Sequence, residues 1–259
     1  SEGTEEKKYF MKRIKIVDTK ITLNQLDVLA QIGQKYAQGL VDFTNRQNIQ
    51  FHYIEIKDIP AIFKLLDSVG LTSRMASGDG PRPIMTSPVA GIDPKEILDA
   101  SYLVKELDSY FDKNDDRFCN FSRKYKVGIS GCGRHTAAHE IQDVAFTAFK
   151  TDEDEVLFDL TLAGGLSKSK QIAHRANKYV KPEQVKEVAV VCAEIFRDHG
   201  NRHNRNKARV RHLVNEWGLE VFVAEIEKRL GYDLQEGLIE PQITPFENRN
   251  HFGIHEAKQ

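Results

Sequence analysis

The sequence predicts an α+β protein in which helices pack on sheets, with a small first domain and a larger second one. Stretches with the two-residue period of strands alternate with stretches that have the 3.6-residue period of helices. At 259 residues, 40% of them hydrophobic, the chain is long enough to bury one large core or two smaller ones. Glycine, proline and serine concentrate in residues 72–92, which is typical of a connection between domains. We therefore predict domains at residues 1–75 and 76–240, followed by a linking segment at residues 241–259.

The first domain reads as strand, helix, two strands and helix. Residues 9–17 form the first strand, and Thr22 with Gln25 makes a capping box that opens a helix ending at Gly39. Two strands follow within residues 40–56, and we expect one shared parity to face the core, namely Val41, Phe43, Ile49, Phe51 and Tyr53. A second helix starts at Asp58 and Pro60 and closes at Gly70. This βαββα order predicts half of a ferredoxin-like module.

The second domain is predicted to mix strands with longer helices. Asp93 and Pro94 should cap a helix that reaches Tyr110. Strand patterns then cover residues 121–130, 141–149 and 156–162. A helix should run from Pro182 to Gly200, and two more helical patterns cover residues 204–217 and 219–230.

Composition excludes several classes of protein. Lysine and arginine (37) nearly cancel aspartate and glutamate (38), so the whole-chain charge gives no general attraction to nucleic acid or membrane. No apolar run is long enough for a membrane helix, and the first residues lack a signal-peptide pattern, so we expect a cytoplasmic protein with no membrane partner. Three cysteines, Cys119, Cys132 and Cys192, indicate a reducing compartment and cannot form a four-cysteine cluster within this chain.

The stretch around Lys124 and Lys126 is the most informative part of the sequence. In a strand, Tyr125, Val127 and Ile129 share one face, and both lysines point to the other. At about 7 Å their repulsion is roughly 0.6 kcal/mol in water and about 2.4 kcal/mol at an effective dielectric of 20, so a pair enclosed in a pocket favours a bound anion. The alternative is a solvated strand face with two ordinary lysines.

Other basic residues support an anion site only in combination. Arg46 interrupts the strand alternation within the polar stretch 44–48, and Arg82 lies in the Gly/Pro-flanked connection. A basic helical face is predicted from Arg202, Arg205, Lys207 and Arg209, and it could be a solvated face, an anion site or a weak nucleic-acid contact.

A zinc site is the weakest of the chemical alternatives. Cys132, His135 and His139 are spaced like metal ligands, but no fourth ligand is evident and Gly131 and Gly133 suggest a tight loop. The phosphate-binding and nucleophile-elbow motifs of common nucleotide enzymes and hydrolases do not occur.

Taken together, six ordered blocks resemble the sirohaem-dependent sulfite and nitrite reductases. They are FTNRQNIQFHYIEIKDIP (43–60), RPIMTSPVAGIDPKEILD (82–99), SRKYKVGISGC (122–132), HEIQDVAFTAF (139–149), FDLTLAGGLS (158–167) and IFRDHGNRHNRNKAR (195–209). The resemblance implies a ferredoxin-like half-domain followed by a sirohaem-reductase-type α/β domain. It also implies sirohaem coupled to a 4Fe-4S cluster, and six-electron reduction of sulfite or nitrite with electrons from ferredoxin or a flavoprotein.

The resemblance also implies roles for individual residues. Arg46, Arg82, Lys124 and Lys126 match the positions of the family's active-site cations. Lysine at position 126, where nitrite-type members usually carry asparagine, favours sulfite. The implied cofactor-binding residues are Arg46, Gln47, Asn48, Arg82, Arg205 and Arg209, because the carboxylates of sirohaem need basic partners.

One departure from the family concerns the cluster. The family's C-x5-C and C-x3-C ligands belong to a second half, and residues 251–259 look like its opening. We therefore expect this chain to act as the first half and to be inactive without the half that carries the cluster cysteines. The rival hypothesis is a degenerate structural or binding subunit that holds no sirohaem.

Overall fold

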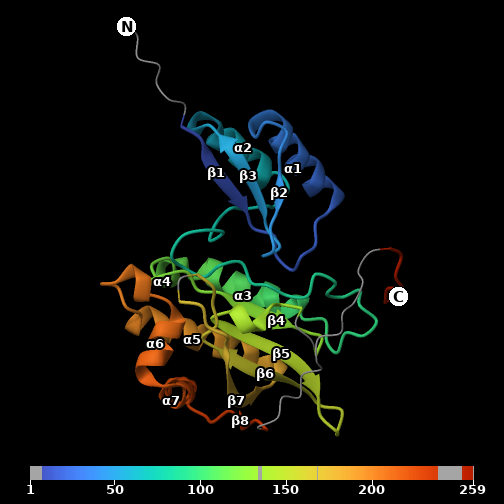
Figure 1. Cartoon of the computed structure of the whole chain (residues 1–259). Helices are drawn as coiled ribbons and strands as arrows, with labels where there is room; N and C mark the ends of the chain where they lie inside the picture. Colours follow the sequence, from blue (N-terminus) through green and yellow to red (C-terminus); the bar gives the residue numbers. More distant parts are fainter. Residues whose placement is uncertain (1–7, 134–135, 168, 239–252, 259) are drawn as a thin grey trace. The chain divides into compact units, whose positions relative to one another are not determined.

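The structure, a computed structural model, describes residues 8–133, 136–167, 169–238 and 253–258. The chain divides into two compact units (Figure 1). Unit 1 contains the first strand and Lys20–Ser77, and unit 2 contains Val17–Thr19 and the chain from Gly78 onward. Each unit is described by itself below.

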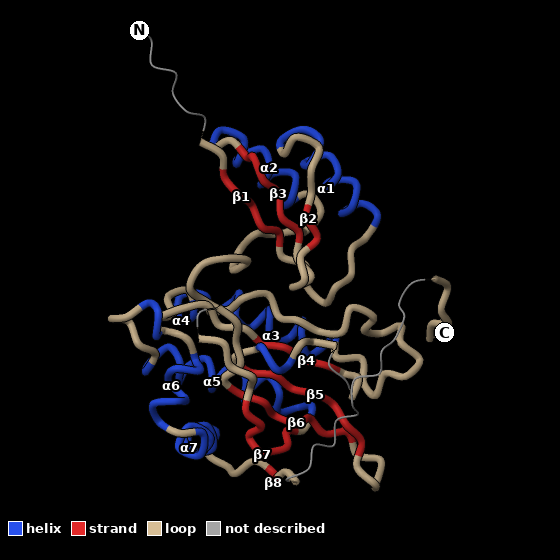
Figure 2. Tube along the Cα trace, in the orientation of Figure 1, coloured by secondary structure: helices blue, strands red, loops and turns tan. Residues whose placement is uncertain are grey.

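Unit 1 has the predicted βαββα order. Its elements are β1 (Phe10–Ile14), α1 (Leu23–Tyr36), β2 (Asp42–Phe43), β3 (Ile49–Ile54) and α2 (Ile59–Asp67). The strands form an antiparallel sheet in the order β1-β3-β2, and both helices cover one face of it (Figure 2). The capping box at the start of α1 is confirmed, because Thr22 Oγ1 accepts the Gln25 N–H and Gln25 Oε1 accepts the Thr22 N–H. Ile14, Ile32, Phe51 and Ile62 are among the side chains in the core.

The predicted alternation of buried and exposed side chains is wrong at the end of β3 and in β2. Tyr53 has φ of 61°, and its side chain is 44% exposed, while its neighbour Ile54 is fully buried. The register with β1 shifts at the same place, since Phe10 pairs with Ile54 and Lys12 with Phe51. Val41 and Phe43 are also exposed, so the alternation predicted for them was wrong about burial.

Unit 2 is built on a five-stranded sheet in the order β4-β5-β6-β7-β8. The first pair, β4 and β5, is parallel, and every other pair is antiparallel. Helix α5 packs on β5 and is itself contacted by α3 and α7 (Figure 1). In chain order the elements are α3 (Ser101–Lys113), α4 (Asp115–Phe118), β4 (Val127–Ser130), β5 (Val144–Lys150), β6 (Val156–Leu162), β7 (His174–Val180), α5 (Val185–His199), α6 (Val210–Trp217), α7 (Leu219–Leu230) and β8 (Gln235–Glu236).

Several predicted boundaries in unit 2 are corrected. The helix expected from Asp93 begins only at Ser101, because the preceding turns lie against the Gly131 carbonyl, which accepts the backbone N–H groups of Ile97 and Leu98. A Cβ at Gly131 would lie 1.8 Å from the Leu98 carbonyl oxygen, so this close approach requires glycine. The helix expected from residue 204 starts at Val210, and strand β7 was not predicted at all.

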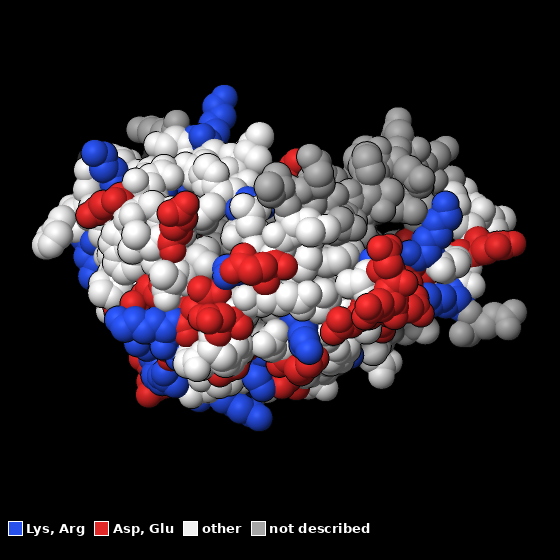
Figure 3. Space-filling model, turned by 90° about the horizontal axis from the view of Figure 1, so that it is seen from below, with Lys and Arg blue, Asp and Glu red and all other residues white. Residues whose placement is uncertain are grey.

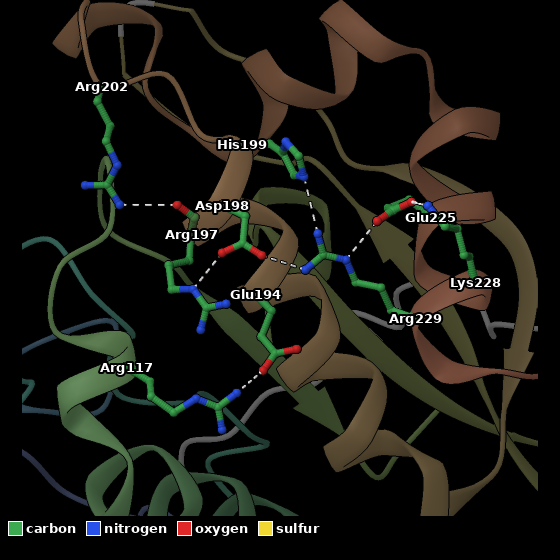
Figure 4. A network of polar contacts seen from close by, with 9 residues as sticks. All are labelled: Arg117, Glu194, Arg197, Asp198, His199, Arg202, Glu225, Lys228 and Arg229. Atoms are coloured by element: carbon green, nitrogen blue, oxygen red, sulfur yellow. Dashed lines mark hydrogen bonds and ion pairs between the residues drawn. The ribbon is translucent and has the colours of Figure 1, made fainter.

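An ion network ties α4, α5 and α7 together (Figure 4). Arg229 donates to Asp198 and to Glu225, both at 2.8 Å, and Asp198 also accepts from Arg197 at 2.8 Å. Arg117 pairs with Glu194 across α4 and α5. Beside the network, the ring of Trp217 lies 4.9 Å from that of His199. None of the described helices is both long and apolar enough to span a bilayer.

Candidate functional site

Backbone pairing brings Arg82 next to the predicted lysine strand. The Arg82 N–H donates to the Tyr125 carbonyl at 2.7 Å, and the Tyr125 N–H donates to the Gly80 carbonyl at 2.9 Å. Tyr125, Val127 and Ile129 are buried, whereas Lys124 and Lys126 on the opposite face are half-buried. The regular strand starts only at Val127, yet the predicted division of faces is present.

Lys124 lies in a strongly positive environment. Burial lowers the pKa of its ammonium, and the nearby cations of Arg209, Arg82 and Arg123 lower it further, while Asp143 opposes them. These side chains come from four stretches far apart in the sequence. The structure therefore brings together three of the residues predicted for the site, Lys124, Arg82 and Arg209.

Asp143, which the sequence analysis did not identify, organises this cluster. Its carboxylate is fully buried and accepts from Arg209 Nη2 at 2.8 and 2.9 Å. The same carboxylate accepts the Lys126 backbone N–H at 2.9 Å. Because Asp143 precedes β5 directly, it fixes both the start of α6 and the position of the lysine strand.

Arg211 and His212 were also missed, and both belong to the cluster. The Arg211 side chain lies in the first turn of α6, and the residue is only 3% exposed. Burial, followed by the charge of Arg209, lowers its pKa. Burial also lowers the pKa of His212, with Arg211 and Arg209 adding to the effect. One signal was available, because Arg211 lies three residues before Val214 on the apolar stripe of the helix.

A glycine pair after β6 lies against these guanidinium groups. The Gly164 N–H donates to the Gln142 carbonyl, and the Gly165 N–H donates to the Gln171 carbonyl. A Cβ at Gly165 would lie 2.4 Å from Arg211 Nη1 and 3.5 Å from Arg209 Nη2. The glycine therefore leaves the space that lets both arginines approach this loop.

The predicted basic helical face is wrong, because its residues precede α6 and have separate partners. Arg205 is 63% exposed and donates to Asp79 at 2.6 Å, and Arg123 pairs with the same carboxylate at 3.0 Å. Burial raises the pKa of Asp79, but the hydrogen bonds from Arg205 and Arg123 leave it below its ordinary value. Arg202 donates to the Asn120 and Arg197 carbonyls. On the face that Figure 3 shows, basic and acidic side chains are interspersed, which does not favour nucleic-acid binding.

The other predicted residues form a turn in unit 1. The Thr44 N–H donates to the Asn48 carbonyl, and Gln47 has φ of 58°. The Asn48 side chain is buried, accepts the Ile16 N–H at 3.3 Å and donates to the Arg46 carbonyl at 2.6 Å. Asn48 thus holds the turn that carries Arg46 and Gln47, and its amide is occupied in doing so.

The zinc alternative gains no support from the described residues. Within them no group of three His, Cys, Asp or Glu side chains could hold a metal ion. His135 lies outside the described residues, and the Cys132 thiol lies 3.0 Å from Thr136 Oγ1. Burial raises the pKa of the Cys192 thiol far above its ordinary value, so this cysteine is an inert core residue.

Comparisons with known proteins agree with this architecture. The chain is 39% identical over 222 residues to "Sulfite reductase [ferredoxin] 2" of Mycolicibacterium paratuberculosis, covering 86% of this chain and 40% of that protein. It is 34% identical over 256 residues to the ferredoxin–nitrite reductase of Leptolyngbya laminosa, covering 96% of this chain and 50% of that protein. The solved structure of Mycobacterium tuberculosis NirA matches with a TM-score of 0.87 and 35% identity, covering 96% of this chain and 45% of NirA.

A more distant structure shows the fold alone. Dissimilatory sulfite reductase I matches with a TM-score of 0.71 at 11% identity, covering 96% of this chain and 74% of that one. Both likenesses confirm the predicted α+β class with its ferredoxin-like half-domain. The chain spans 40–50% of the length of the curated relatives named above.

The family assignment rests on two adjoining matches. Residues 2–69 match the nitrite/sulfite reductase ferredoxin-like half domain. Residues 77–234, more than half of the chain, match the nitrite and sulphite reductase 4Fe-4S domain. The chain therefore belongs to the nitrite and sulfite reductase family.

Proposed function

We propose that this chain supplies the cationic half of a sirohaem-dependent reductase that carries out the six-electron reduction of sulfite or nitrite. The observation that carries the proposal is the cluster of Lys124, Arg82, Arg209 and Arg211 around one buried carboxylate. The donor set fits a polycarboxylate cofactor, because the Nε atoms of Arg209 and Arg211 are buried and have no hydrogen-bond partner among the described residues. In this proposal the rest of the enzyme supplies the cluster cysteines, and the assembled enzyme binds sirohaem.

The chain's own residues have two tasks in this proposal. Lys124 and Lys126, with Arg82, bind the oxyanion and stabilise negative charge as oxygen leaves. A lowered pKa makes the Lys124 ammonium a stronger acid than that of an ordinary lysine, so it gives up a proton to the reacting oxyanion more readily. Arg209 is held by Asp143, so it presents its remaining donors from a fixed position. When bound, sirohaem supplies the iron that the oxyanion binds and, with a 4Fe-4S cluster, the path for electrons.

The electron donor and oxyanion are proposed by analogy with relatives. Relatives named for both sulfite and nitrite reduction carry ferredoxin in their names, so ferredoxin is the proposed donor, with a flavoprotein as the alternative. Sulfite is the preferred oxyanion in this proposal, because of the second lysine at position 126. Arg46 is also proposed to bind the oxyanion and sirohaem, with Gln47 beside it as a further cofactor contact.

The decisive experiment is kinetic. Lys124→Ala and Lys126→Ala are made in the complete enzyme, and sulfite- and nitrite-dependent oxidation of reduced methyl viologen is measured. Each variant should lose about 100-fold or more in kcat, since each removes a charge that acts on the reacting oxyanion. Lys186→Ala is the matched control, because Lys186 pairs with Glu106 on exposed helix surfaces.

Two results would contradict the proposal. One is unchanged kinetics with both oxyanions in both lysine variants. The other is a complete, correctly folded enzyme without the visible absorption bands of sirohaem, which would favour the rival hypothesis of a structural or binding subunit.

A further inference from the structure

The Arg211 guanidinium is a buried cation for which the sequence predicted no role. Arg211 is 3% exposed, and its Nε and Nη1 atoms are buried without a hydrogen-bond partner in the described part of the chain. Arg209 Nε and His212 Nε2 are in the same condition. Three guanidinium nitrogens at the start of α6, namely Arg211 Nε, Arg211 Nη1 and Arg209 Nε, are therefore left without an acceptor among the described residues.

Such an arrangement destabilises the protein unless something compensates it. A guanidinium keeps its proton in a protein, so Arg211 cannot relieve its burial by becoming neutral. A buried charge without a counter-ion is strongly destabilising. The neighbouring carboxylate, Asp143, is already engaged by Arg209 and the Lys126 N–H. Lys124, Arg209 and Arg211 thus face one carboxylate, which leaves an excess of positive charge.

The loop around Gly165 supplies room for Arg211, and none of its described side chains accepts a hydrogen bond from Arg211 Nε or Nη1. Gly165 lies so close to Arg211 that its missing Cβ would be 2.4 Å from Nη1. Alanine there would meet the end of a flexible side chain and not the backbone, so it would move the guanidinium without breaking the fold.

We propose that Arg211 binds a carboxylate of the bound tetrapyrrole, with Arg209 Nε as a supporting donor. This inference rests on the proposed function, because that function places a polycarboxylate beside the cluster.

The experiment uses the complete enzyme and three variants. Arg211→Met removes the charge at similar length, Gly165→Ala displaces the guanidinium without removing it, and Arg202→Met is the control for losing an arginine that bonds only main-chain and amide oxygens at the surface. Each protein is produced in cells that make sirohaem and in cells that do not. Sirohaem per protein and its release rate are measured on the first set, and Tm on the second.

We expect opposite changes in the two measurements. Arg211→Met should release sirohaem about 10- to 100-fold faster, because a charged hydrogen bond is lost. Without sirohaem, the same variant should melt roughly 2–8 °C higher, because the uncompensated buried charge is gone. Gly165→Ala should also lower sirohaem retention, and Arg202→Met should leave it unchanged.

The outcomes separate this inference from the function on which it rests. If the unmodified enzyme holds sirohaem and Arg211→Met retains it equally well, the role of Arg211 is wrong and the proposed function stands. A sirohaem-free Arg211→Met protein that melts lower than the unmodified one would show that Arg211 is a structural residue. If the unmodified enzyme never holds sirohaem, the proposed function itself fails.

Discussion

Two groups of charged residues in unit 2 use the same residue types in opposite ways. In the ion network of α4, α5 and α7, each named arginine has a carboxylate, and Asp198 and Glu225 each accept from two cations (Figure 4). In the cluster around Asp143, one carboxylate faces several cations, and Arg211 has buried donors without partners among the described residues. The charges of the network are therefore balanced, whereas the cluster has an excess of positive charge among the described residues.

The largest expected effect on the free energy of unfolding comes from removing the Asp143 carboxylate, which accepts from Arg209 and from the Lys126 N–H. Asp143→Ala should lower the free energy of unfolding by about 3–5 kcal/mol, because Arg209 would become a second buried charge without a counter-ion. Asp143→Asn should cost less, since it keeps an acceptor for Arg209. Urea unfolding at pH 7 measures both. Asp79→Ala, which breaks partly exposed pairs, is the comparison, and an equal loss there would remove the distinction between buried and partly exposed pairs.

A smaller effect is expected in the network. Asp198→Ala should cost about 1 kcal/mol, because partly exposed pairs contribute little individually. Burial raises the pKa of Asp198, but the hydrogen bonds from Arg197 and Arg229 leave it below its ordinary value. The stabilisation is therefore complete above the unfolded pKa of about 3.9 and is lost as the pH falls through the folded value. Urea unfolding from pH 7 down to pH 3 should show the variant and the unmodified protein converging below about pH 4.

The smallest effect on the free energy of unfolding is expected at Lys124, where a substitution should stabilise the protein. The pKa of Lys124 is lower in the folded protein than the value of about 10.4 expected for the unfolded chain. Between these two pKa values the unfolded chain binds more protons than the folded one, so the free energy of unfolding rises with pH there. Lys124→Met should raise the free energy of unfolding at pH 7 by up to about 1 kcal/mol. The gain should shrink as the pH approaches 10. A variant that is less stable at pH 7 would show that Lys124 is not repelled by its neighbours.

Local signals in the sequence predicted much of the fold, and tertiary contacts account for the errors. The capping box at Thr22 and the glycine stop at Gly200 are set within one helical turn, so the sequence shows them directly. Tyr53 takes a left-handed conformation that shifts the register with β1, which no alternation pattern could reveal. Strand β7 was missed because Asn177, with φ of 52°, interrupts its period, and because Arg175 and Lys178 occupy half-buried positions in it.

For the site, too, local patterns were predicted correctly and tertiary contacts were missed. The alternation of half-buried Lys124 and Lys126 with buried Tyr125 was predicted correctly because it is a local pattern, although β4 itself begins only after Lys126. Asp143 and Arg211 were missed because each looks like an ordinary charged residue until the start of α6 meets the start of β5. That the predicted residues bind sirohaem or the oxyanion stays a prediction, which the experiments above test.

The position of Trp217 provides a built-in optical reporter. It is the sole tryptophan of the chain and lies in unit 2 between His199 and Phe222, whereas the aromatic residues of unit 1 are tyrosines and phenylalanines. Emission excited at 295 nm therefore follows the melting of one unit, while circular dichroism follows both. If the two signals change at different temperatures, the two units unfold independently, and a single heating scan gives the unfolding temperature of each unit.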